Sequence, residues 1–203
     1  MNINRKRFLT GCILVALSAT PVLVNAESAS DVGNSNLSAA ARLNLQVVIP
    51  GFLLFRVGTA GANADTISFD MTNCVTGGSC TVGDGTAFTN GLGGDAAGGS
   101  GASVSLFSNA GQVTITETNN TAGSGLVSGT SNLSLDEITA VSDNGSLDTP
   151  KLSDVGGNTT TPALNGATNV TTQSAVWTYS YDNTTVPDPG TYDVQITYTA
   201  TAL

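Results

Sequence analysis

Residues 177–200 read WTYSYDNTTVPDPGTYDVQITYTA, and this stretch decides the fold class. Aromatic or aliphatic side chains occupy alternate positions on both sides of a segment rich in turn-forming residues. Such a period of two residues is typical of β-strands with one buried face. The stretch therefore predicts a C-terminal hairpin whose second strand is long and central in its sheet. The alternating residues are Trp177, Tyr179 and Tyr181, followed by Tyr192, Val194, Ile196, Tyr198 and Ala200.

The rest of the chain repeats this organisation of strands and turns. The same alternation predicts strands at 66–72, 103–108, 112–118 and 133–141, and an edge strand at 42–57 that Pro50 and Gly51 break into two parts. Residues 83–101 are rich in glycine and predict a long surface loop. We therefore expect an all-β fold, an immunoglobulin-like antiparallel β-sandwich with long Gly-rich loops, as a single domain over residues 27–203.

The N-terminus has the organisation of a secretory signal peptide. Three basic residues at positions 5–7 precede an apolar run from Phe8 to Val24, and Val24 and Ala26 provide the small side chains of a cleavage site. We expect cleavage after Ala26, and export through the periplasm of a bacterium to the extracellular surface. Residues 9–12 also match a lipoprotein cleavage pattern at Cys12, but most of the apolar run follows that cysteine. No later segment is apolar for long enough to predict a membrane span.

The expected mature chain is strongly acidic. It carries all fifteen Asp and Glu residues but only three basic side chains, Arg42, Arg56 and Lys151. Binding of a nucleic acid requires clustered Lys and Arg side chains that neutralise phosphates, so we expect no nucleic acid as a partner.

Two cysteines, Cys74 and Cys80, remain after removal of the leader. An even number of cysteines in an exported protein predicts a disulfide, here one that closes a short loop. The active-site spacing of a redox pair has two intervening residues instead of five, so a structural bridge is favoured.

The composition argues against catalysis. The chain contains no histidine, which removes the usual general base and the usual zinc ligands. Asp136 and Glu137 are the nearest pair of carboxylates, but neighbours on a strand point to opposite faces. We therefore expect no enzyme activity, no catalytic residues, no cofactor and no metal. Acidic and amide residues between positions 136 and 154 are read as turn residues, although a calcium site there is an alternative.

The segment Leu43, Leu45, Val47 and Ile49 has one apolar face and is a candidate strand for self-association. Two alternatives stay open for it. It pairs within its own domain, as first strands usually do, or it fills an acceptor groove on a neighbouring subunit.

The amphipathic segment at 43–49, together with the terminal strand GTYDVQITYTA at 190–200, resembles exported immunoglobulin-like subunits of bacterial surface fibres, especially fimbrial subunits of the chaperone–usher type. The resemblance covers the two ends of the chain. It implies assembly by strand donation, in which a partner's extended segment completes an open sheet, and it implies a periplasmic chaperone as a partner. The close spacing of the cysteines departs from many such subunits, whose cysteines bridge distant strands.

These observations predict a secreted structural or surface protein, a subunit of an extracellular fibre, pilus or biofilm matrix that associates with itself or with other fibre subunits. An alternative is a carbohydrate-binding or surface-binding module in which Trp177, Tyr179 and Tyr181 form an exposed platform instead of core. A glycosidase with carboxylates from distant loops is a third.

Overall fold

The computed structural model describes residues 28–61, 63–121 and 123–202. The chain divides into two units, residues 1–49 and residues 50–203. The expected signal peptide and its cleavage site lie outside the described residues.

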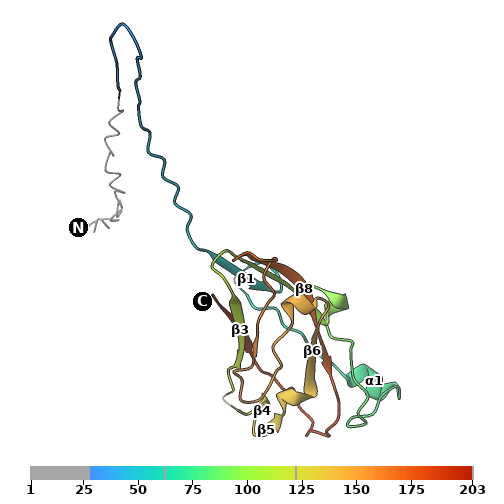
Figure 1. Ribbon diagram of the computed structural model, residues 1–203. Helices are drawn as coiled ribbons and strands as arrows, with labels where there is room; N and C mark the ends of the chain where they lie inside the picture. Colours follow the sequence, from blue (N-terminus) through green and yellow to red (C-terminus); the bar gives the residue numbers. More distant parts are fainter. Residues whose placement is uncertain (1–27, 62, 122, 203) are drawn as a thin grey trace, which may run out of the picture. The chain divides into compact units, whose positions relative to one another are not determined.

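Residues 50–203 form two main antiparallel sheets (Figure 1). The four-stranded sheet has the order β1-β2-β8-β6, and the three-stranded sheet has the order β7-β3-β9. A further pair, β4 and β5, forms a small hairpin. The strands are β1 (Leu53–Val57), β2 (Gly101–Ser108), β3 (Val113–Asn119), β4 (Leu126–Ser128), β5 (Ser131–Leu133), β6 (Ile138–Ser142), β7 (Thr159–Thr160), β8 (Thr171–Tyr181) and β9 (Ile196–Ala202).

Helical structure in this unit is limited to short segments. The α-helix α1 (Thr72–Thr76) is five residues long. The 3-10 helices are η1 (Ala97–Gly99), η2 (Leu135–Glu137) and η3 (Gly145–Leu147). The all-β prediction is therefore confirmed, and the two antiparallel sheets are consistent with a β-sandwich.

The hydrophobic core draws on both main sheets. Val104 and Leu106 of β2 and Trp177 of β8 belong to the same buried cluster as Val113 and Ile115 of β3. Alternate positions on these strands are more exposed and, except for Phe107 and Val176, carry Ser or Thr, as expected for strands with one buried face. Threonines at 114, 116 and 118 of β3 thus lie opposite threonines at 201, 199 and 197 of β9.

The predicted C-terminal hairpin is wrong in its pairing. β8 pairs with β2 and β6, whereas β9 pairs with β3 in the other sheet. β9 is also an edge strand and not a central one. Alternation identifies a strand with one buried face, but it does not identify the strand's neighbours, and the long connection between Tyr181 and Ile196 lets the chain change sheets.

Three other predicted strands need correction. Over 66–72, only Ser68 forms a β-bridge, to Leu92, and α1 begins at Thr72. The strand expected at 133–141 is interrupted by η2. Residues 42–52 form no strand, so only the second part of the predicted 42–57 edge strand is present, as β1.

The described part of the first unit, residues 28–49, contains no helix or strand. Its polar part includes a hydrogen bond from the Ser38 amide to the Asp31 carboxylate, at 3.0 Å. The apolar side chains of its last seven residues are exposed, between 75% for Leu43 and 85% for Leu45.

Candidate functional site: an apolar groove between β1 and β9

A groove of about 620 Å³ lies between the two sheets, lined by β1 and β9, by the segment 64–69 and by residues of β2, β6 and β8. We call it the β1–β9 groove, because Phe55 and Val57 of β1 line it together with Ile196 and Tyr198 of β9. Its wall is mainly apolar. Its other apolar or aromatic lining residues are Ala64, Ile67, Phe69, Ala102, Leu126, Leu135, Ile138, Leu152, Tyr179, Tyr192 and Val194, and its polar lining residues are Asp65, Thr66, Asp193, Gln195 and Thr197.

The burial of the strands shows that the core is incompletely covered at this groove. In β2 the inward side chains Val104 and Leu106 are 2% and 1% exposed, but the inward side chains of the neighbouring edge strand β1 are only half-buried. In the other sheet, Ile115 of β3 is 0% exposed, whereas the inward positions of β9 are again half-buried. In each sheet, the inward side chains of the edge strand at the groove are therefore less buried than those of the neighbouring strand.

Both strands at the opening have a free edge within the described residues. β1 pairs with β2 alone, and β9 over Ile196–Ala202 pairs with β3 alone. The amide and carbonyl groups on the free edges can form hydrogen bonds with an added strand. The site can therefore accept an extended segment with apolar side chains on one face.

Aromatic rings support the β9 side of the groove. The ring of Tyr198 meets the ring of Trp177 edge to face, with centroids 5.0 Å apart, and its hydroxyl lies 3.1 Å from the hydroxyl of Tyr179. The indole N–H of Trp177 donates to the carbonyl of Leu147 at 3.0 Å. Burial is the main cause that raises the pKa of Tyr198 well above its ordinary value, so this cluster is neutral at physiological pH.

Glu117 is a buried carboxylic acid next to this cluster. It is opposite Tyr198 in the β3–β9 ladder, its side chain is 0% exposed, and neither carboxylate oxygen has a hydrogen-bond partner among the described residues. Desolvation by burial raises the pKa of Glu117, and the nearby backbone of Asn158 opposes this shift. Burial therefore disfavours the ionised form of this side chain.

The aromatic residues of the predicted platform lie in the core. Trp177 is 0% exposed, Tyr179 is 8% exposed and Tyr181 is 6% exposed. None of these rings presents an open face to the solvent, so they do not form the exposed surface that stacking on a sugar requires. Their burial agrees with the core interpretation.

The candidate self-association residues Leu43, Leu45, Val47 and Ile49 lie in the first unit, while the groove lies entirely in the second. The groove itself was missed by sequence reasoning. β9 alternates as cleanly as fully paired strands do, and alternation carries no signal for a missing neighbour. The available signal was the strongly amphipathic segment immediately before β1.

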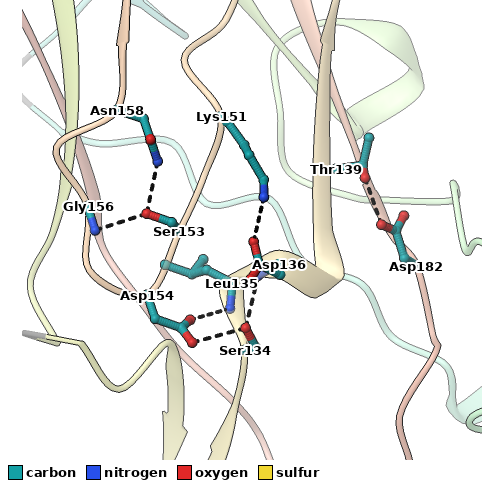
Figure 2. A network of polar contacts seen from close by, with 10 residues as sticks. All are labelled: Ser134, Leu135, Asp136, Thr139, Lys151, Ser153, Asp154, Gly156, Asn158 and Asp182. Atoms are coloured by element: carbon teal, nitrogen blue, oxygen red, sulfur yellow. Dashed lines mark hydrogen bonds and ion pairs between the residues drawn. The ribbon is translucent and has the colours of Figure 1, made fainter.

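The loop carboxylates and amides serve the local backbone. Asp154 accepts hydrogen bonds from the Leu135 amide at 2.6 Å and the Ser134 hydroxyl at 3.0 Å, as Figure 2 shows. Asp136 forms an exposed ion pair with Lys151 at 2.9 Å. Glu137 is buried instead, and it accepts hydrogen bonds from the amide and hydroxyl of Thr184.

The remaining residues of the calcium alternative have similar roles. Asp143 accepts from the Val176 amide, Asn144 caps η3 by accepting from the Ser146 amide, and Asp148 accepts from the Thr149 amide. Asn144 therefore lies at the start of the 3-10 helix η3. Among the described residues there is no cluster of three or more acidic, Cys or His side chains suited to a metal ion.

Cys74 lies in α1 and Cys80 follows it by six positions. The side chain of Cys74 lies outside the described part of the structure, so the Cys74–Cys80 disulfide stays a prediction. A search of the described residues for a helix able to cross a membrane finds none.

Comparison of the chain with protein-family models, with curated proteins and with solved structures finds no match.

Proposed function

We propose that the protein is an exported structural subunit of an extracellular fibre, pilus or biofilm matrix, and that it polymerises by strand addition. In this proposal, residues 43–49 of one copy fill the β1–β9 groove of the next. The observation that carries the proposal is the presence in one chain of an open apolar groove and an exposed segment with a matching apolar face.

The dimensions of segment and groove are compatible. Residues 43–49 match the seven-residue length of β9, and a strand of that length extends over about 23 Å. Alternate side chains of an inserted strand would enter the groove, and these are Leu43, Leu45, Val47 and Ile49. The polar Arg42, Asn44 and Gln46 would then remain on the outer face.

Strand addition would remove two unfavourable features of the isolated domain. It would give hydrogen-bond partners to the free edges of β1 and β9, and it would cover their half-buried inward side chains. A completed immunoglobulin-like sandwich is the fold that we propose for the assembled state. A periplasmic chaperone that covers the groove before assembly fits the same surface.

The link between the segment and β1 favours a neighbouring copy as the acceptor. Residues 50–52 form no turn. The Asn109 side chain accepts from the Phe52 amide at 2.8 Å and donates to the Pro50 carbonyl at 3.0 Å. A hairpin that folded residues 43–49 back onto β1 would need a tight turn here and would break these bonds.

The test compares the mature protein, residues 27–203, with a double variant, Leu45→Asp and Val47→Asp. A matched control, Asn44→Asp and Gln46→Asp, places the same two charges on the opposite face. We expect the wild type and the control to form polymers visible by electron microscopy, and the L45D/V47D variant to stay monomeric, because burial of two carboxylates in an apolar groove is unfavourable.

A deletion of residues 27–49 separates assembly from folding. The shortened protein should keep the far-ultraviolet circular dichroism of a β-protein and should bind a synthetic peptide of residues 40–50. The proposal fails if the wild type stays monomeric at high concentration while the deletion unfolds the domain, because the segment would then belong to its own core.

A further inference from the structure

Three apolar side chains form a patch where β1 begins, in which Leu54 and Phe107 are exposed and Phe52 is half-buried. Leu54 is 65% exposed and Phe107 is 44% exposed, although the two residues are directly paired in the β1–β2 ladder. The ring of Phe52 lies against that of Phe107, with centroids 4.7 Å apart. We call Phe52, Leu54 and Phe107 the β1 patch.

The β1 patch differs from its surroundings on the outer face of the four-stranded sheet. Along β2 the next outward residues are Ser105 and Ser103, and across the sheet the partner of Phe107 on β8 is Thr172. Small polar residues are what a solvent-facing sheet requires. Nothing in the fold of the domain explains two large apolar side chains at this corner, and an exposed apolar cluster of this kind marks an interaction surface.

The β1 patch is fixed rigidly to the point where the N-terminal segment joins the domain. The Phe52 carbonyl accepts from the Asn109 amide at 3.3 Å and from the Ser108 hydroxyl at 3.1 Å. The Asn109 side chain holds the Phe52 amide and the Pro50 carbonyl. The backbone from Pro50 to Leu54 therefore cannot move away from β2 without losing four hydrogen bonds.

The length of the chain then restricts what can cover the β1 patch. Only Pro50 and Gly51 separate Ile49 from Phe52, and three residue steps span at most about 10 Å. If Ile49 occupies the groove of a neighbouring copy, as the proposed function requires, Phe52 lies within that distance of Ile49 and brings the β1 patch close to the rim of the groove.

We infer that the β1 patch is a second contact between consecutive subunits, which docks against the rim of the groove that receives the same chain's segment 43–49. The inference rests on the proposed function. The contact is head-to-tail, so each copy uses its β1 patch on one neighbour and its groove on the other, and such an interface propagates into a filament. The rigid link would fix the angle between neighbouring subunits.

The experiment separates docking of the β1 patch from strand addition. The test variant is Leu54→Thr with Phe107→Ser, which places on this corner the residue types that the rest of the face carries. The matched control is Val141→Thr, an exposed apolar residue of β6 on the opposite edge of the same sheet. A second test variant, Leu54→Thr alone, keeps the Phe52–Phe107 contact and covers the case in which the double variant does not fold.

Two measurements are made on each mature protein. First, binding of a peptide of residues 40–50 is measured by calorimetry. Each protein in this measurement also carries L45D/V47D, so that its groove is not filled by the segment of another copy. The critical concentration for polymerisation is measured with the natural segment present. We expect peptide binding to be unchanged in every variant, and the critical concentration of L54T/F107S to rise about tenfold, because two partly exposed apolar side chains lose their burial at the interface. L54T should show a smaller rise and V141T none.

The inference is overturned if L54T/F107S, or L54T where the double variant does not fold, assembles at the same concentration as the wild type. An equal rise for V141T would also overturn it, because the effect would then not belong to this corner. Failure of the wild-type groove to bind the peptide would instead contradict the proposed function itself.

Discussion

Glu117 is the residue whose chemistry is least compatible with its surroundings. Its carboxyl group is buried between the sheets without a hydrogen-bond partner among the described residues, beside Tyr198, and burial raises its pKa. A buried carboxylate without a partner is costly, so burial disfavours the ionised form of Glu117. Ionisation of this one group would place a negative charge in the ladder that joins β3 to the groove strand β9.

This placement predicts a pH dependence of stability that Glu117→Gln should remove. The folded state binds the proton more tightly than the unfolded state, so Glu117 contributes fully to stability below its unfolded pKa. That contribution is lost as the pH rises from about 4 through the raised folded value. We expect the difference in unfolding free energy between the wild type and E117Q to fall with rising pH, measured by urea denaturation from pH 4 to 8. The same slope in both proteins would contradict this assignment. Glu137→Gln serves as a control at a buried carboxylate that has partners.

At the scale of elements, alternation located the central strands well. β2 and β3 lie within one or two residues of their predicted bounds, because buried apolar side chains alternate with Ser and Thr over most of their length. β8 begins six residues before Trp177, where Thr171 and Gln173 carry no hydrophobic signal. Sheet order was not predictable, since the pairing of β9 with β3 joins residues far apart in the sequence.

The glycine-rich loop is held in place by a polar side chain whose structural role could not be predicted from the sequence. Asn183 is 0% exposed, and its side chain donates to the Thr81 carbonyl and accepts from the Gly83 amide at 2.7 Å. Phe88 also forms a β-bridge with Tyr181. The side chain of Asn183 therefore anchors the start of the loop to the end of β8, although the sequence indicates Asn183 only as a turn residue. The groove was unpredictable for a related reason, since its existence depends on which edges the sheets leave free.

The predicted disulfide belongs to the segment around α1. Replacing Cys74 and Cys80 by serine should lower the free energy of unfolding by about 2 kcal/mol, because closing so short a loop removes little entropy from the unfolded chain. Chemical denaturation of both proteins measures the difference, and thiol titration of the unreduced wild type checks the bridge. Two reactive thiols in the unreduced protein would contradict the bridge. Polymerisation should survive the change, since Cys80 is not among the described residues that line the groove.

At the scale of the whole molecule, charge opposes assembly. The expected mature chain has fifteen acidic and three basic side chains, so approaching subunits repel one another. Salt screens this repulsion over distances of about 10 Å at 0.1 M. If polymers form by insertion of an apolar strand, their growth should accelerate as sodium chloride rises from 10 to 150 mM, as followed by light scattering. Slower growth in salt would indicate that the subunits are held together by ion pairs instead.

The contact between Trp177 and Tyr198 has an optical consequence. Trp177 is the only tryptophan of the chain, and the ring that it touches lines the groove. Its intrinsic fluorescence therefore comes from a single site that lies one side chain away from the groove. If a segment fills the groove, the polarity and the freedom of motion around this fluorophore change, so we expect that occupancy can be followed in unlabelled protein and in real time.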